Sequence, residues 1–158
     1  MSLKNSPYYL KPLGKKPKYT ETEKQIIAWS LEWEGSISLT DGQRADYAQI
    51  GLSINNTNLK RLQRFKEIVQ LGKISKGYAK GENHKPIFLW SVHSLLECWY
   101  ILKYVYPYLI GKQQQAKNFI AFAESRLKRG ATLNRVLFSR YEYSLIEKTK
   151  KLNKRGIS

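Results

Sequence analysis

The stretch from Ile27 to Gly35, IAWSLEWEG, constrains the fold of this chain more than any other segment. Apolar residues at helical spacing lead into two acids, Glu32 and Glu34, and Gly35 then ends the helical pattern. The next residues, 36–40, alternate between polar and apolar side chains, which is typical of a half-buried strand. A helix therefore ends close to the start of a strand, with acids at its carboxyl end. Because the helix macrodipole places partial negative charge at that end, we expect something positive to bind these acids.

Helices and strands follow one another in a regular order along the rest of the chain. The patterns predict helices at about 20–33, 58–70, 95–106, 112–128 and 134–151, and strands at about 36–40, 46–55, 72–79 and 86–93. A capping box from Thr20 to Glu23 begins the first helix, and Pro107 ends the third. In the first two strands, apolar side chains share one face and mostly short polar ones the other, which favours antiparallel pairing with one face outside the core.

Basic residues dominate the charge of the chain. Its 158 residues are enough for one domain with a core, and 28 Lys and Arg against 12 Asp and Glu give a net charge of +16. A charge this large in a small domain predicts a polyanionic partner, most commonly nucleic acid. Residues 1–19 combine prolines, a glycine and lysines, so we expect a basic extended arm there and a single domain over 20–158.

Several sequence features bear on the compartment and on cofactors. No apolar run is long enough to span a bilayer, and the N-terminus lacks the apolar core of a signal peptide. The single cysteine, Cys98, lies in an apolar helical pattern, which predicts a buried thiol in a reducing compartment. We therefore expect a soluble intracellular protein without a membrane partner, in an archaeal cytoplasm or an organelle. His84 and His93 lack the spacing of metal ligands.

The Ile27–Gly35 stretch resembles the LAGLIDADG motif of homing endonucleases, whose nine positions it fills in order, with Ala28 and Gly35 identical. The predicted order of elements is similar to the αββαββα core of these enzymes, followed here by extra C-terminal helices. The segment from Pro107 to Ala116 resembles their P-x-L-x-x-K-x-x-Q-A segment. The resemblance implies an α+β fold in which a four-stranded antiparallel sheet forms a saddle with its concave face in the major groove of DNA.

This resemblance also implies an activity. The chain is expected to be a site-specific double-strand DNA endonuclease of intron homing, a homodimer that packs through helix 22–33 and cleaves a long pseudo-palindromic target. Hydrolysis would depend on Mg²⁺ or another divalent ion such as Mn²⁺, with Ca²⁺ giving a non-cleaving state. Glu34, at the eighth motif position, is the expected metal ligand and a catalytic residue. Lys112 matches the active-site lysine of the family, and Asn55 matches a polar residue beside the catalytic water.

Further residues receive supporting and DNA-binding roles. Glu32 is expected to bond near the helix end, and Gln115 to support the lysine or pack at the helix turn. The expected DNA contacts lie on outward strand positions, near the first hairpin and at the start of the second helix: Ser36, Ser38, Thr40, Arg44, Tyr47, Gln49, Ser53, Lys60, Arg61, Lys73 and Ser75. Many of these side chains are short, so we expect water-mediated base contacts. The basic arm and last helix would bind phosphates.

The chain departs from the family pattern at two positions of the motif. Trp29 and Trp33 stand where the family usually has small residues that let two helices nearly touch. The paired helices would then lie further apart, be rotated, or interlock their indoles.

Two other functions stay open. One is a non-cleaving nucleic-acid binder on the same fold, either an intron RNA maturase or a transcription regulator. The other is a basic ribosome-associated structural protein. The acid at Glu34 favours the enzyme over the binder, because members of the family that have lost cleavage commonly lose this acid. A ribosome-associated protein predicts neither Glu34 nor Lys112 in register.

Overall fold

A computed structural model of the chain describes residues 16–42, 48–77, 81–129 and 137–155. Its elements, in chain order, are α1 (Glu21–Glu34), β1 (Gly35–Asp41), β2 (Ala48–Asn56), α2 (Leu59–Val69), β3 (Lys73–Lys76), β4 (Phe88–Val92), α3 (Leu95–Val105), the 3₁₀ helix η2 (Tyr106–Tyr108), α4 (Gln113–Lys128) and α5 (Arg140–Arg155). The predicted αββαββα order with extra C-terminal helices is confirmed. None of the described helices is long and apolar enough to cross a membrane.

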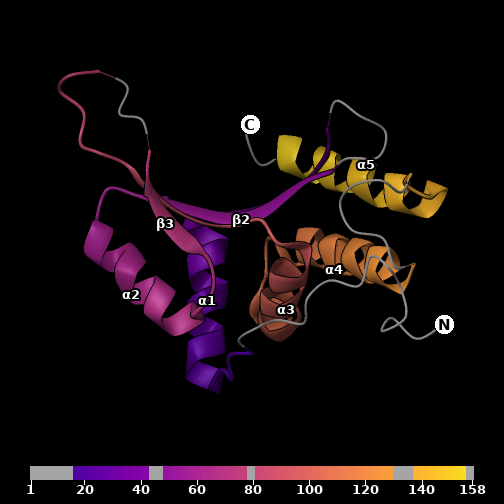
Figure 1. The fold of residues 1–158 in the computed structure, drawn as a ribbon, viewed down its shortest axis with the longest axis horizontal. Helices are drawn as coiled ribbons and strands as arrows, with labels where there is room; N and C mark the ends of the chain where they lie inside the picture. Colours follow the sequence, from indigo (N-terminus) through magenta and orange to yellow (C-terminus); the bar gives the residue numbers. More distant parts are fainter. Residues whose placement is uncertain (1–15, 43–47, 78–80, 130–136, 156–158) are drawn as a thin grey trace.

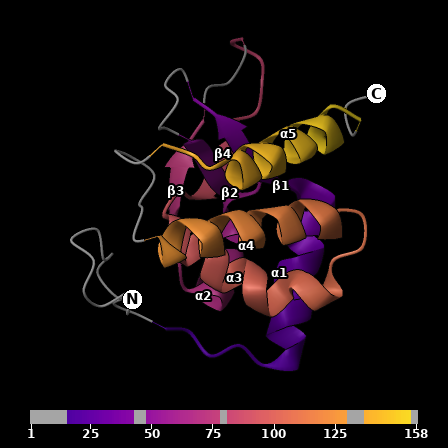
Figure 2. The same ribbon diagram turned by 90° about the vertical axis from the view of Figure 1, so that its right-hand side faces the viewer.

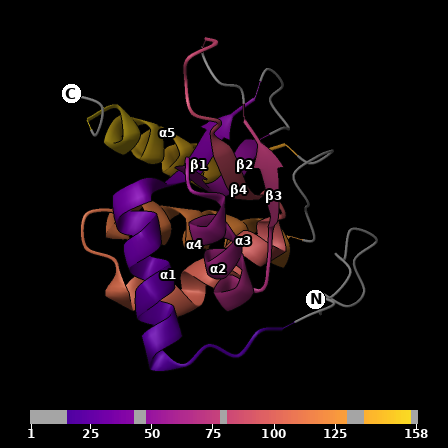
Figure 3. The same ribbon diagram turned by 90° about the vertical axis from the view of Figure 1, so that its left-hand side faces the viewer.

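The strands form one antiparallel sheet in the order β1-β2-β4-β3. Helices α1 to α4 lie on one side of this sheet, and β2 runs across it as a long curved strand (Figure 1). Seen from the left of that view, α1 and α2 lie side by side below the strands (Figure 3). The opposite face of the sheet therefore points away from α1 to α4, as the alternating pattern of β1 and β2 predicts.

Helix α1 passes directly into β1, and local contacts explain both of its ends. Thr20 Oγ1 accepts a hydrogen bond from the Glu23 amide, and the Glu23 carboxylate accepts one from the Thr20 amide, which confirms the predicted capping box. At the other end, a Cβ on Gly35 would lie 2.7 Å from Leu31 Cα. Because there is no room for a side chain, only glycine lets the strand begin this close to the last helical turn.

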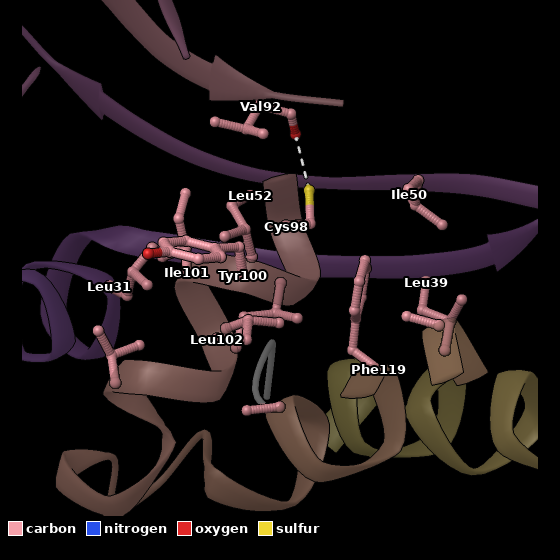
Figure 4. Close-up of a cluster of buried hydrophobic side chains, with 14 of the residues drawn as sticks. Leu31, Leu39, Ile50, Leu52, Val92, Cys98, Tyr100, Ile101, Leu102 and Phe119 are labelled. Atoms are coloured by element: carbon pink, nitrogen blue, oxygen red, sulfur yellow. Dashed lines mark hydrogen bonds between the residues drawn. The ribbon is translucent and has the colours of Figure 1, made fainter. Parts of the chain in front are cut away.

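The core lies between the sheet and its helices. Alternate residues of β1 and β2, among them Leu39, Ile50 and Leu52, point toward the helices and meet side chains of α3 and α4 (Figure 4). Cys98 of α3 is fully buried there, and its thiol donates a hydrogen bond to the Val92 carbonyl at 3.4 Å. Burial raises the pKa of this thiol far above its usual value, so Cys98 behaves as a small apolar core residue. The predicted buried thiol is confirmed.

Several predicted boundaries shift in the structure. The last helix begins at Arg140 rather than near residue 134, because Ser139 and Glu142 form a reciprocal pair of side chain to backbone hydrogen bonds that starts it there. Helix α3 ends at Val105, and η2 follows it with Pro107 in its first turn. Strand β3 is four residues long, shorter than the predicted 72–79, of which residues 78 and 79 lie outside the described part.

Helix α5 packs on α4 and reaches the edge of the sheet at β1 (Figure 2). Near its start, the fully buried Glu142 accepts hydrogen bonds from Arg126 of α4 and from Arg129, the residue that follows this helix, at 3.3 and 2.5 Å. Near its end, Asn153 donates to the Ile37 carbonyl of β1 at 3.4 Å, and Lys150 pairs with Asp41 at 3.0 Å. These contacts cover the β1 edge of the sheet with a helix.

The last residues of the predicted arm run along the domain. Tyr100 donates its hydroxyl to the carbonyl of the buried Pro17 at 2.5 Å, and Tyr19 donates its hydroxyl to the Val69 carbonyl at 2.7 Å. Burial raises the pKa of Tyr19 above its usual value. Residues 1–15, which carry the rest of the predicted arm, lie outside the described residues.

Candidate active site and nucleic-acid interface

Glu34 is the last residue of α1, and its carboxylate lies where the helix meets the sheet. One carboxylate oxygen accepts a 2.8 Å hydrogen bond from Asn56 Nδ2 at the end of β2. The other lies 3.4 Å from Nη1 of Arg61 in α2. The Glu34 side chain is 39% exposed and that of Arg61 67% exposed, so this ion pair is well solvated and weak. The contacts orient the carboxylate and leave it accessible to a further ligand.

Glu32, two residues earlier, serves a different purpose. Its carboxylate accepts hydrogen bonds from the backbone amides of Ile110, Gly111 and Lys112, at 3.1, 2.6 and 3.2 Å. These amides immediately precede α4, so a negative charge sits at the N-terminal end of that helix, where the macrodipole favours it. A Cβ on Gly111 would lie 2.6 Å from Glu32 Oε1, which explains the glycine. The carboxylate is therefore engaged in joining α1 to α4.

Lys112 approaches the same joint from the other side. Its ammonium donates to the carbonyls of Leu31 and Glu32 at the end of α1, at 2.8 and 2.6 Å. The side chain is half-buried, and this burial lowers its pKa, while the nearby Glu32 carboxylate opposes part of the shift. In this conformation the ammonium binds backbone carbonyls two and three residues before Glu34. The catalytic role of Lys112 stays a prediction.

Asn55 and Asn56 lie on opposite faces of β2. Asn55 is exposed on the outward face, in a row with Leu89 of β4 and Ser75 of β3. Asn56 is the one whose side chain reaches Glu34. The structure thus places Asn55 among the outward positions of the sheet and brings its neighbour to the acidic site. Asn56 was missed by the sequence reasoning, although strand alternation puts it on the same side as Ile54, which pairs with Gly35 next to Glu34.

The other residues predicted near the site are partly brought together. Arg61 contacts Glu34, whereas Lys60 is exposed at the start of α2. Gln115 lies in the first turn of α4, and its buried side-chain oxygen has no hydrogen-bond partner among the described residues. Its support of Lys112 stays a prediction.

The outward face of the sheet carries mostly short polar side chains. Strand register places Thr40 opposite Gln49, Ser38 opposite Gly51, and Ser36 opposite Ser53, whose hydroxyl oxygens are 2.7 Å apart. The last of these rows continues through Ser91 to the exposed Lys73 at the β3 edge. The structure thus gathers the predicted strand positions on one face, while Arg44 and Tyr47 lie outside the described residues.

His93 and Ser91 also belong to this face, and the sequence reasoning assigned them no contact there. The His93 ring lies beside Gly51. A Cβ on Gly51 would be only 2.9 Å from Nδ1 of this ring. The signal was present in the sequence, since residues 91 and 93 alternate with the apolar Val92, although Ser91 is itself only 3% exposed. Recognising it required the pairing of β4 with β2, which brings sequence-distant residues together.

Apolar side chains are exposed along one stripe of α1. Ile26, Trp29 and Trp33, spaced by three and four residues, are 39%, 57% and 83% exposed. Trp29 and Trp33 border a hollow of about 240 Å³ that also contacts Glu34, Asn56 and Phe65. A stripe of this kind on a helix face that ends at Glu34 is typical of a surface that another molecule covers.

The donor chemistry at Glu34 fits a hard divalent cation, which prefers carboxylate oxygens. No group of three or more His, Cys, Asp or Glu side chains that could hold a metal occurs in the described part of the chain. The Glu34 carboxylate can supply two oxygens at most, so such a cation would need further oxygen ligands, from water, a phosphate or a backbone carbonyl.

Comparison with known proteins gives matches in structure alone. No protein-family model and no curated protein sequence matches the chain. The homing endonuclease I-CvuI, in complex with the I-CreI target, matches with a TM-score of 0.55 and 18% identity, over 84% of this chain and 96% of that one. The archaeal intron-encoded homing endonuclease I-Vdi141I, complexed with DNA, matches with a TM-score of 0.55 and 16% identity, over 85% and 98% of the two chains.

A longer relative matches with part of its length. The LAGLIDADG homing endonuclease I-GzeII, in complex with its DNA target, has a TM-score of 0.56 and 14% identity, over 85% of this chain and 44% of that one. Identities this low establish the architecture and leave the activity to be argued from the site. The chain has the fold of the LAGLIDADG homing endonucleases, as its motif and its order of elements predict.

Proposed function

We propose that this protein is a site-specific, divalent-metal-dependent double-strand DNA endonuclease that acts as a homodimer in intron homing. The observation that carries the proposal is the exposed Glu34 carboxylate, which lies at the junction between α1 and the sheet and is oriented by Asn56. An acid at a helix C-terminus is disfavoured by the macrodipole, and a bound cation would compensate it.

Double-stranded DNA is the partner that the surface favours. The outward face of the sheet presents hydroxyl and amide groups in rows, with Lys73 at one edge. The net charge of +16 attracts a polyanion irrespective of its sequence, and polar strand positions can read base edges in the major groove. Structures of I-CvuI, I-Vdi141I and I-GzeII contain DNA, and the shared fold supports the same class of partner here.

A second copy of the chain is the proposed protein partner. The match with this chain covers 96% of I-CvuI but 44% of I-GzeII. Two copies of this chain would therefore be about as long as one chain of I-GzeII. The exposed stripe Ile26, Trp29 and Trp33 on α1 supplies an apolar surface for isologous packing. Such packing would bring two Glu34 residues near the two-fold axis. How the tryptophans of the two copies fit together stays open among the three arrangements predicted from the sequence.

The chemistry would then centre on Glu34. A divalent ion such as Mg²⁺ bound by this carboxylate would supply activation of a water and charge neutralisation at the phosphate and the leaving 3′ oxygen. Asn56 and Arg61 hold the carboxylate in place. Arg61 and Lys60 at the start of α2 can bind the DNA phosphates that flank the scissile bond. Lys112 fixes the end of α1, and through it the position of Glu34, unless DNA binding draws its ammonium away.

The proposal is tested by cleavage of a randomised double-stranded DNA library, with Mg²⁺ or with EDTA. The wild-type protein, Glu34→Gln and the matched control Glu82→Gln, an exposed acid in the β3–β4 connection, are compared at equal concentrations. We expect cleavage of one long sequence by wild type and Glu82→Gln with Mg²⁺, and none by Glu34→Gln.

The other outcomes separate the alternatives. Tight duplex binding without cutting by any of the proteins would favour a non-cleaving binder on this fold. Undiminished cutting by Glu34→Gln would exclude this acid as the metal ligand. Absence of both binding and cutting would contradict the proposed function as a whole.

A further inference from the structure

A second hollow opens on the outward face of the sheet, beside Ser38 and Thr40 of β1. Its volume is about 560 Å³, and the side chains that border it include Ser38, Thr40, Gln49, Ser53 and His93. Gly51 of β2 also borders it. All of these residues except His93 have neutral side chains at any pH where the protein is folded, and most of them are short. His93 is therefore the chemically distinctive group on this part of the face.

The imidazole of His93 is held in a defined orientation. Residues 52–56 of β2 pair with β4, so Ile50 lies beyond the last paired residue. The Ile50 carbonyl is 3.2 Å from Nδ1 of His93, the residue that follows β4. The ring also rests against Gly51, where a Cβ would approach Nδ1 to 2.9 Å and Cε1 to 3.3 Å. A larger residue at position 51 would displace the ring.

This contact determines what the ring presents to solvent. A carbonyl oxygen can only accept, so Nδ1 must carry the hydrogen of the bond to Ile50. In the neutral imidazole the second nitrogen, Nε2, is then an acceptor. His93 is exposed, so its ring adds an oriented acceptor to the hydroxyl and amide groups of the outward face.

We propose that His93 is a specificity-determining residue that reads a base with an exocyclic amino group, adenine or cytosine, in the major groove. Adenine N6 and cytosine N4 are donors there, whereas guanine and thymine present acceptors at the corresponding edge. An Nε2 acceptor can bond to the first pair of bases and is repelled by the second. The inference rests on the proposed function, because it requires that the outward face of the sheet binds duplex DNA. In a homodimer the preference would occur at two symmetry-related positions of the target.

The experiment is selection from a randomised duplex library by the full-length protein, with Ca²⁺ in place of Mg²⁺ so that binding is scored. Wild type, His93→Ala and His93→Lys are compared. We expect wild type to select adenine or cytosine at two symmetric positions, and His93→Ala to lose about five- to tenfold of that discrimination, the worth of one hydrogen bond. Lysine only donates, so His93→Lys should reverse the preference to guanine or thymine at the same positions.

Two further variants test the placement of the ring, and the first of them leaves the imidazole itself unaltered. Gly51→Ala should displace His93 and weaken the same two preferences. In the double variant Gly51→Ala/His93→Ala, the loss of these two preferences should equal that of His93→Ala alone. The added Cβ would also lie 3.0 Å from the Val92 carbonyl oxygen, and we expect that contact to affect stability rather than base preference. Circular dichroism melting of each variant checks that it folds, and His93→Ala and His93→Lys alter an exposed side chain.

The outcomes distinguish this inference from the proposed function. If wild type selects no sequence, the proposed function fails. If wild type selects a sequence that His93→Ala leaves unchanged, or weakens equally at every position, the base-reading role of His93 is wrong and the endonuclease proposal stands.

Discussion

Glu32 and Lys112 bind the ends of each other's helices. The Glu32 carboxylate accepts three backbone amides that precede α4, and the Lys112 ammonium donates to two backbone carbonyls that end α1. Each charge lies where the macrodipole of the other helix is of opposite sign. The pair therefore ties α1 to α4 within two residues of Glu34. The position of the proposed metal ligand depends on this joint.

Replacing Glu32 by glutamine tests the joint. The neutral amide cannot accept with both of its terminal atoms, so at least one backbone amide near Gly111 loses its partner. We expect the free energy of unfolding to fall by about 2 kcal/mol, because hydrogen bonds to a charged acceptor are lost. Urea denaturation measures it. Glu82→Gln, which removes an exposed acid in the β3–β4 connection, is the control and should change stability little. Equal stability of Glu32→Gln and Glu82→Gln would mean that the Glu32 carboxylate does not stabilise the contact between α1 and the start of α4.

The order of elements could be predicted because it depends on local patterns. Thr20 and Glu23 form their capping box within one helical turn. The alternation of polar and apolar residues in β1 and β2 indicates which face of each strand is buried, whichever strand it pairs with. The late start of α5 was equally local. Ser139 and Glu142 have capping-box spacing. The prediction placed the start of the helix too early because the hydrophobic pattern continues on the N-terminal side of Ser139.

The site was harder to predict because its contacts join distant segments. That Lys112 reaches the carbonyl of Leu31 depends on how η2 packs against both α1 and α4, which no local pattern encodes. The choice between Asn55 and Asn56 depends on a register difference of one residue, and such a difference moves a side chain to the other face of a strand. His93 needed the β2–β4 pairing as well.

Asn56 should matter more for cleavage than Asn55. Its amide orients Glu34 from 2.8 Å, whereas Asn55 lies on the outward face of the sheet. Loss of a group that orients a metal ligand commonly reduces activity by 10-fold or more, so we expect Asn56→Ala to lower the single-turnover cleavage rate about tenfold. Asn55→Ala is the matched control and should change the cleavage rate less than about twofold while altering base preference. A larger rate loss for Asn55→Ala would restore the original prediction.

The tryptophan stripe on α1 should control dimerisation. Trp29 and Trp33 are large exposed apolar side chains at helical spacing, and buried aromatic residues dominate the binding energy of many interfaces. We expect Trp33→Ser to raise the dimer dissociation constant by about thirtyfold or more, with the monomer still folded. Sedimentation equilibrium measures the constant. Tyr141→Ser on α5, which removes an aromatic residue that is 56% exposed, is the control. An unchanged dissociation constant for Trp33→Ser would place the interface elsewhere.

Glu142 should govern stability in acid. Burial alone would raise its pKa, but hydrogen bonds from Ser139, Arg129 and Ser125 and the charge of Arg126 outweigh burial and lower the pKa below its ordinary value of 4.5. The stabilisation is therefore complete above about pH 4.5 and is lost as the pH falls through the lowered folded value. Glu142→Gln leaves the buried Arg126 without its carboxylate, so we expect a loss of about 3–5 kcal/mol at neutral pH.

Thermal melting between pH 2 and 7 measures this dependence. The melting temperature of wild type should fall below pH 4.5 more steeply than that of Glu142→Gln, so that the difference between them shrinks in acid. Glu147→Gln, one turn further along α5, removes an acid whose side chain is 57% exposed and should follow the wild-type curve. A constant difference between wild type and Glu142→Gln across the whole range would mean that the carboxylate stabilises α5 by its shape rather than by its charge.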